Sequence, residues 1–326
     1  MSAPLLRAEN LSRGFRARGA WSARRRDIMA VRAVDLEIGR AEAVGVVGES
    51  GCGKSTLGRL LLRLLKPTEG RVLFDGQDLD QAGAATLRRL RRRMQLIFQD
   101  PYGSLDPRRR IGSQIADGML IHRLADGAAA RDRVATLLRQ VGLEPHHGDR
   151  LPHEFSGGQR QRIAIARALA TGPDFIVADE PVSALDMSVQ AQIVNLLADL
   201  RAELGLSLLF ISHDLPVVRH LSDRMVVMYL GRIVELGPTR ELFAAPAHPY
   251  TRALLAATPS LARAGRAPAV LAGELPSPAA PPSGCGFRTR CPHAIADCAA
   301  AVPALRVVRD KHLVACLRDD VVNRSG

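Results

Sequence analysis

A short glycine-rich stretch carries residue types and a spacing suited to holding phosphate groups. It reads G-x-x-x-x-G-K-S and consists of Gly48, Glu49, Ser50, Gly51, Cys52, Gly53, Lys54 and Ser55, followed by Thr56. Glycines let backbone N–H groups converge on phosphate oxygens where a Cβ would interfere, and a helix N-terminus adds favourable partial charge. In such a loop the lysine neutralises β- and γ-phosphates and the hydroxyl after it holds Mg²⁺. The stretch therefore predicts a nucleotide site.

The flanking sequence supplies the elements that must position this loop. Residues 43–47 before it form an apolar run typical of a buried strand, and residues 56–63 after it have the apolar spacing of a helix. A chance glycine-rich turn is the alternative reading, and it would not explain a strand, a loop and a helix in that order.

Two adjacent carboxylates end a second apolar run. Asp179 and Glu180 follow residues 175–178, which are all apolar. In a nucleotide site Asp179 would hold Mg²⁺ through its water shell, and Glu180 would orient or deprotonate the attacking water. Asp186 lies six residues further on, just before an expected helix at 188–204.

Two more polar residues follow expected strands. Gln99 comes after residues 94–98 and opens a polar, proline-punctuated loop that can face both a ligand and a partner. His213 comes after residues 206–211. A lone histidine is more often structural, but one at the end of a strand in this series is well placed to contact a γ-phosphate.

A second candidate anion site lies far from the first in sequence. Ser156, Gly157, Gly158 and Gln159 precede a strong helix former at 163–170. A serine before two glycines and a helix N-terminus can bind an anion, although a simple helix cap explains the same residues. Two such sites in one chain suggest a shared ligand.

This ordered set of motifs resembles the ATP-binding-cassette (ABC) ATPases over roughly residues 5–259. The resemblance implies an α/β fold, with a RecA-like P-loop NTPase core, an antiparallel β-subdomain and a helical subdomain at about 100–171. It implies an ATPase in which Glu180 and His213 are catalytic and in which Mg²⁺ is held by Ser55, Gln99 and Asp179. Phe155 replaces the leucine that usually precedes the signature motif.

The family further implies that two cassettes bind ATP head to tail. The phosphate loop of one chain and the signature residues 156–159 of the other would hold each nucleotide, which accounts for two anion sites so far apart. Asp186 would lie in the same composite site. Gln99 would act as a sensor between the nucleotide and a membrane partner.

The adenine contact is less defined. Phe15 and Trp21 lie in a basic, irregular insert between two expected strands, 5–11 and 30–38, where the family often has a tyrosine. Either aromatic ring could stack on adenine, with Phe15 favoured, or serve local packing.

The carboxyl-terminal part narrows the subfamily. Residues 247–255 are similar to the segment that closes the cassette in dipeptide and oligopeptide importers, and residues 98–108 are similar to a loop of the second, F-type ATPase of such systems. The resemblance implies a non-identical partner ATPase, two membrane permeases and an extracytoplasmic substrate-binding protein. Importers of nickel or glutathione share these features, and a non-transport ABC ATPase is a further alternative.

Four cysteines mark a tail at 262–326, after a cassette at 1–261. An Ala-, Pro- and Gly-rich connector leads to Cys285, Cys291, Cys298 and Cys316, spaced C-x5-C-x6-C-x17-C. Widely spaced thiolates suit a 4Fe-4S cluster, which some peptide importers carry in a similar tail. Zinc, with His293 or His312 as substitute ligands, and plain buried thiols remain alternatives.

Charge and hydropathy set the remaining expectations. The 326 residues carry a net charge of +12, mostly from arginine, with clusters at 24–26, 88–93 and 108–110. These clusters suit solvated faces, or an acidic or lipid partner, and no nucleic-acid module accompanies them. No run approaches the roughly 18 apolar residues of a membrane span. We therefore expect a peripheral protein at the cytoplasmic face of the membrane that binds no nucleic acid.

Overall fold

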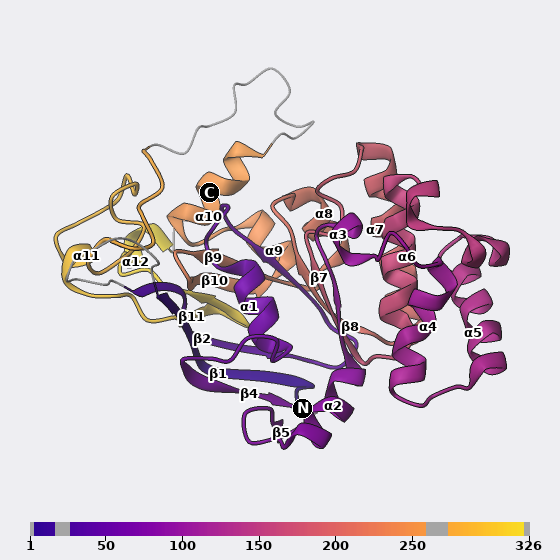
Figure 1. The fold of residues 1–326 in the computed structure, drawn as a ribbon. Coiled ribbons are helices and arrows are strands. Elements are labelled where there is room, and N and C mark those ends of the chain that lie inside the picture. Colours follow the sequence, from indigo (N-terminus) through magenta and orange to yellow (C-terminus); the bar gives the residue numbers. More distant parts are fainter. Residues whose placement is uncertain (1–2, 17–26, 259–272, 323–326) are drawn as a thin grey trace, which may run out of the picture.

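A mixed eight-stranded sheet forms the centre of the protein (Figure 1). The computed structural model describes residues 3–16, 27–258 and 273–322. The strand order is β11-β12-β10-β9-β3-β8-β7-β6, and the strands from β9 to β6 run parallel. The bounds of these strands are β3 Ala43–Val47, β6 Met94–Ile97, β7 Phe175–Asp179, β8 Ser207–Ile211, β9 Arg224–Tyr229, β10 Arg232–Pro238, β11 Arg306–Arg309 and β12 His312–Val314.

The central parallel strands are buried on both faces. Every residue of β3, β7 and β8 is buried, as expected for parallel strands covered on both sides. Along β3 the side chains alternate between two hydrophobic cores, with Val44 and Val46 in one and Ala43 and Val47 in the other. The first core also contains the apolar face of helix α1 (Lys54–Leu61), and the second contains that of α7 (Met187–Leu204).

A second, antiparallel sheet packs over the α1 side. Its order is β2-β1-β4-β5, formed by β1 Leu6–Arg16, β2 Asp27–Ile38, β4 Glu69–Phe74 and β5 Gln77–Asp78. Strand β1 extends beyond the expected 5–11 because its register with β2 continues to Arg16 through several irregularities. Together with the central sheet, this arrangement confirms the predicted α/β fold with an antiparallel β-sheet.

Helices fill the chain between β6 and β7 and lie on the right in Figure 1. They are α3 Pro101–Ser104, α4 Ile111–Ile121, α5 Gly127–Gln140, the 3-10 turns Pro145–Asp149 and Pro152–Glu154, and α6 Gly157–Leu169. The caps follow from the sequence, since the Asp126 carboxylate accepts from the Ala129 amide at 3.2 Å at the start of α5. The remaining helices of the first 258 residues are α2 Ala84–Arg93, α8 Leu215–Leu221, α9 Thr239–Ala244 and α10 Pro249–Ala257. In residues 3–16, 27–258 and 273–322, no helix is both long enough and apolar enough to cross a membrane.

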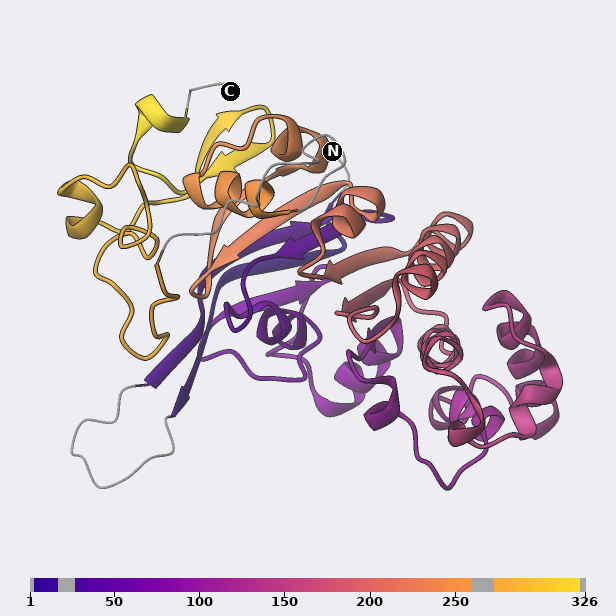
Figure 2. The same cartoon turned by 90° about the horizontal axis from the view of Figure 1, so that it is seen from above.

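The carboxyl-terminal segment joins the central sheet, which the sequence did not predict. Strand β12 pairs antiparallel with β10, and β11 pairs with β12 at the sheet edge. Two short helices, α11 Asp297–Ala300 and α12 Asp319–Val322, complete this segment. It lies beside the β1–β2 side of the molecule in both ribbon views (Figures 1 and 2).

A buried hydrogen bond between a histidine and a carboxylate joins this segment to the central sheet. His312 Nε2 on β12 lies 2.7 Å from Glu235 Oε1 on β10, and both side chains are fully buried. The Glu235 carboxylate also accepts from the amides of Ala247 and His248, at 2.6 and 3.0 Å. Burial alone would raise the pKa of Glu235, but the bonds from His312 and these amides outweigh it and hold the pKa below its usual value.

We predict that Glu235→Gln lowers the free energy of unfolding by about 3 kcal/mol or more, because an NH₂ donor would replace one of the two buried oxygens that now accept from buried donors. Because the folded pKa is depressed, the carboxylate stabilises the protein above pH 4.5 and loses this effect as pH falls through the folded pKa. Denaturant unfolding should therefore show the two proteins converging at acid pH. Glu241→Gln, at an exposed position on α9, is the matched control. Equal stability of Glu235→Gln and wild type at pH 7 would contradict this account.

Candidate functional site

The predicted site residues meet where three neighbouring parallel strands end. The phosphate loop follows β3, Asp179 and Glu180 lie at the end of β7, and His213 follows β8, which pairs with both β3 and β7. Ligands bind in α/β sheets at the carboxyl ends of such strands. The sheet order therefore brings together groups that are more than 150 positions apart in the sequence.

The phosphate loop requires glycine where it touches neighbouring backbone. Gly53, which caps α1, has φ 106°, and a Cβ there would lie 2.1 Å from the carbonyl oxygen of Ala30. A Cβ on Gly48 would lie 2.3 Å from the carbonyl oxygen of Met228. The loop lies so close to β2 and β9 that a larger residue at either position would force the backbone to move.

The Lys54 ammonium lies inside the loop. The side chain is buried, and Nζ donates to the carbonyls of Gly48 at 2.8 Å and Glu49 at 3.0 Å. These bonds hold a positive charge where the phosphates of a nucleotide would be bound, as the motif predicts.

Ser55 and Asp179 form an oxygen pair suited to Mg²⁺. The Ser55 hydroxyl donates to Asp179 Oδ1 at 2.7 Å across 124 positions of sequence. Burial raises the pKa of Asp179, and the Ser55 hydrogen bond only partly offsets this effect. Hard cations prefer oxygen ligands, and a bound cation would favour the ionised carboxylate.

The two other predicted residues, Gln99 and His213, both lie next to the Glu180 carboxylate. Gln99 Nε2 donates to Glu180 Oε2 at 3.1 Å, and His213 Nδ1 lies 3.5 Å from the same oxygen. Glu180 adopts φ 46°, an uncommon conformation for a residue other than glycine, and its amide donates to Ile211 at 3.0 Å. This turn brings the carboxylate, only 18% exposed, within reach of both partners.

The signature residues lie away from the phosphate loop of the same chain. Ser156 and Gln159 form a reciprocal capping box at the start of α6, with bonds of 3.3 and 3.0 Å. In both ribbon views, α6 lies among the helices and apart from α1 (Figures 1 and 2). A Cβ on Gly158 would lie 2.4 Å from Val189, so α6 packs closely against α7, which Asp186 caps.

The aromatic candidates are only partly placed. Phe15 lies near the end of β1, is 37% exposed, and has the Arg13 guanidinium 4.9 Å from its ring centroid. Trp21 lies outside the described residues. Phe15 therefore has an accessible face, and its contact with adenine stays a prediction.

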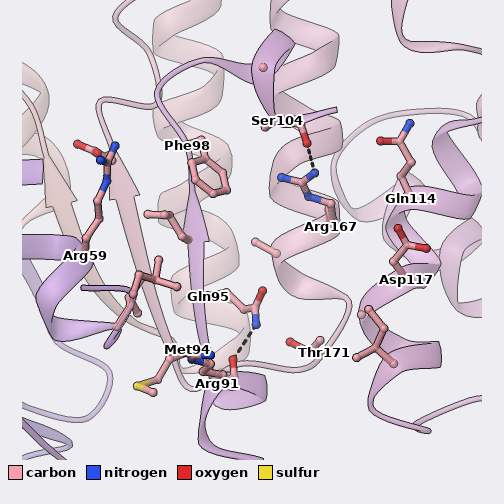
Figure 3. A pocket seen from close by; sticks show the side chains of 18 of the residues that line it. Arg59, Arg91, Met94, Gln95, Phe98, Ser104, Gln114, Asp117, Arg167 and Thr171 are labelled. Carbon is pink, nitrogen blue, oxygen red and sulfur yellow. Dashed lines mark hydrogen bonds between the residues drawn. The ribbon is translucent and has the colours of Figure 1, made fainter. Parts of the chain in front are cut away.

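A cavity of about 740 Å³ lies between the central sheet and the helices (Figure 3), and Asp179 is one of the residues that line it. Its walls come from α1 through Arg59, from β6 through Gln95, and from α6 through Arg167, which donates to the Ser104 carbonyl. Phe98 and Gln99, in the loop after β6, also line it. The sequence predicted that loop as a partner contact, but carried no signal for Arg59 or Arg167.

The four tail cysteines line one small cavity together with His248 and His293. Its volume is about 10 Å³, roughly the space of one water molecule. Burial raises the pKa of Cys285 to about 11, and it also raises the pKa of Cys291 and Cys316. Among the described residues, no three His, Cys, Asp or Glu side chains are close enough to hold a metal ion. His312 bonds to Glu235 and does not line the cavity, which removes it as the zinc ligand considered above.

Comparison with known proteins gives matches over most of the chain. The family description "ABC transporter" matches residues 31–183, and "Oligopeptide/dipeptide transporter, C-terminal region" matches residues 234–298. A putative peptide import ATP-binding protein of Brucella ovis is 53% identical over 321 residues, which cover 98% of this chain and 99% of that protein. The oligopeptide transport ATP-binding protein AppF of Bacillus subtilis is 51% identical over 294 residues, 89% of each chain.

Solved structures agree with this result. A dimeric post-hydrolysis structure of the ATP-binding cassette MJ0796, bound to ADP and phosphate, has a TM-score of 0.64 and 30% identity, covering 72% of this chain and 99% of that one. CbiO1 of Clostridium perfringens, part of an ABC transporter complex, also has a TM-score of 0.64 and 30% identity, covering 74% and 92%.

We predict that Ser55→Ala weakens ATP binding about tenfold, or by about 1.4 kcal/mol, in the presence of Mg²⁺ but not in excess EDTA. Only the first condition uses the hydroxyl next to Asp179. Titration of the purified protein with a fluorescent ATP analogue measures both affinities. Ser113→Ala, which loses an exposed hydroxyl that donates to the Arg110 carbonyl just before α4, is the control. The same Mg²⁺ dependence in Ser55→Ala and wild type would contradict the assignment.

Proposed function

Because the chain belongs to the family of ATP-binding proteins of ABC transporters, we propose that it hydrolyses ATP to drive uptake of di- or oligopeptides across the cytoplasmic membrane. One observation carries the proposal. The chain is 53% and 51% identical in sequence to two proteins named for peptide import or oligopeptide transport, over 98% and 89% of its length. The match of residues 234–298 to the carboxyl-terminal region of such transporters also supports it. These names favour peptides over nickel or glutathione, and favour transport over a non-transport ABC ATPase.

The site residues have different roles around the phosphates of ATP. The phosphate-loop amides and Lys54 bind the phosphates, and Ser55, Asp179 and Gln99 would hold Mg²⁺, which neutralises charge on the phosphate oxygens. Glu180 orients the attacking water and accepts its proton, while His213 contacts the γ-phosphate. The distances of 3.1 and 3.5 Å from Glu180 to Gln99 and His213 support a site in which one carboxylate organises both groups.

A second cassette completes each nucleotide site. Ser156, Gly157, Gly158 and Gln159 lie at a helix start remote from the phosphate loop of their own chain, so they would contact ATP held by a partner. The dimeric state of the MJ0796 cassette supports this arrangement. In a peptide importer of this type the partner would be a second, non-identical ATPase.

The cavity beside Gln99 is the proposed contact for one of the two permease subunits. Phe98, Leu120 and Ile121 expose 42%, 47% and 56% of their surface in the loop and helix around it. A permease helix seated there would contact Gln99 and thereby sense the nucleotide. The protein would then act peripherally at the cytoplasmic face, with an extracytoplasmic binding protein delivering peptide. We assign residues 1–261 to the ATPase domain, with helices at about 100–171, and residues 262–326 to the tail.

We predict that Glu180→Gln lowers ATP turnover of the assembled transporter at least about 100-fold while ATP affinity is retained. An amide can occupy the same space but cannot accept the proton. Phosphate release and nucleotide titration measure the two quantities on one sample. Glu203→Gln, at an exposed position on α7, controls for the loss of charge. Wild-type turnover in Glu180→Gln would refute the role of Glu180.

The tail cysteines are proposed to hold a 4Fe-4S cluster. Four thiols line one cavity, as the ligand set of such a cluster requires, and the cavity of about 10 Å³ would have to enlarge and reshape for the cluster to bind. The raised pKa values of Cys285, Cys291 and Cys316 mean that binding would release protons from these thiols. The ligands would be Cys285, Cys291, Cys298 and Cys316, and the cluster would cross-link the tail.

We predict that anaerobically purified protein contains about four irons and four acid-labile sulfides per chain. Cys291→Ser should lose most of both, because one of the four ligands is removed. Cys52→Ser changes the one cysteine outside the cavity and should keep both. Zinc without sulfide would favour the zinc alternative, and the absence of iron, sulfide and zinc would leave the reading of four plain thiols without a metal.

A further inference from the structure

The carboxyl-terminal segment contacts the phosphate loop directly. Arg290 donates from Nη1 to Glu49 Oε2 at 2.7 Å and from Nη2 to Glu49 Oε1 at 3.0 Å. The two residues are 241 positions apart, and their side chains are 5% and 24% exposed, respectively. A planar, two-bonded arginine–carboxylate pair with little solvent access is among the stronger ionic contacts in proteins.

The backbone of Glu49 is held from the same direction. Its amide donates to the hydroxyl of Tyr250 on α10 at 2.9 Å. Phe287, close to Arg290 in sequence, packs against Tyr250 and against Tyr229, with ring centroids 5.3 and 5.4 Å apart. Both the side chain and the amide of Glu49 are therefore fixed by groups that rest on one aromatic cluster.

The charge of Glu49 makes this contact relevant to nucleotide binding. Glu49 follows the first glycine of a loop whose purpose is to attract anions, and its backbone carbonyl already accepts from Lys54. A carboxylate without a partner at this position would repel the ATP phosphates at short range. Arg290 supplies the balancing charge from outside the loop.

We propose that Arg290 is a positioning residue for ATP binding, which neutralises Glu49 and holds the phosphate loop in its binding conformation. Cys291 is the next residue along the chain and lines the cysteine cavity. A change in that cavity would therefore move Arg290, so the tail and the nucleotide site are coupled, and the coupling acts in both directions. This coupling would set ATP affinity whatever substrate the transporter carries.

Purified transporter carrying Arg290→Met tests the first part. We expect Kd and KM for ATP to rise about tenfold, with kcat at saturating ATP changed less than twofold, because the loop is loosened but Glu180 is intact. Arg290→Lys keeps the charge but loses the paired geometry. Its Kd and KM for ATP should lie between those of wild type and those of Arg290→Met. Arg288→Met removes a nearby guanidinium that donates to Ser283, and the variant should bind ATP like wild type.

The double variant Arg290→Met/Glu49→Gln separates neutralisation from simple anchoring of the tail. If repulsion by Glu49 is the cause, removing the carboxylate should restore most of the lost ATP affinity. A double variant as weak as Arg290→Met, or wild-type affinity in folded Arg290→Met, would overturn the proposal. Thermal unfolding without nucleotide checks folding, and Arg290→Lys serves if the methionine variant is unstable.

Alkylation of the metal-free protein tests the coupling. MgATP should slow maleimide labelling of Cys291 several-fold in wild type, measured by peptide mass spectrometry, and should have no such effect in Arg290→Met. Equal labelling rates with and without MgATP in wild type would overturn the link between the two sites, whatever substrate the transporter carries.

Discussion

The close packing of the phosphate loop against its surroundings is the constraint on which the rest of the structure depends. Gly48 and Gly53 lie against the carbonyls of Met228 and Ala30, and the Gly231 amide donates to the Cys52 carbonyl at 2.9 Å. Loop amides can converge on phosphates only when the loop is held from several sides at once. Strands β2 and β9, the turn before β10 and the carboxyl-terminal segment together provide that support.

The parallel sheet then decides which side chains can act on the bound phosphates. Strand β8 pairs with β3 on one side and β7 on the other, so His213 and Glu180 come within 3.5 Å of each other. The left-handed backbone at Glu180 turns its carboxylate toward this point. By contrast, α6, which begins with the signature residues, lies among the helices and apart from α1 (Figure 1). This separation supports the proposal that a second cassette completes each nucleotide site.

Local patterns predicted much of this site, and long-range contacts could not be predicted. The phosphate loop was recognisable because its glycines and Lys54 act within a few residues of one another, and Asp179 because it ends an apolar run. The Arg290–Glu49 pair joins residues 241 positions apart, and the His312–Glu235 pair joins residues 77 positions apart. No periodicity marks such partners, since each residue alone resembles an ordinary surface charge. Strands β11 and β12 are four and three residues long, too short for a hydrophobic pattern to indicate them.

The most direct test of the account is transport by the purified components in sealed vesicles. The measurement is accumulation of labelled di- and oligopeptides by vesicles containing this chain, its partner ATPase and the two permeases, with the binding protein and peptide on one side and MgATP on the other. The account predicts peptide accumulation that requires ATP hydrolysis and peptide-stimulated phosphate release. ATP hydrolysis without accumulation of any peptide tested, in vesicles that transport nickel or glutathione instead, would contradict it.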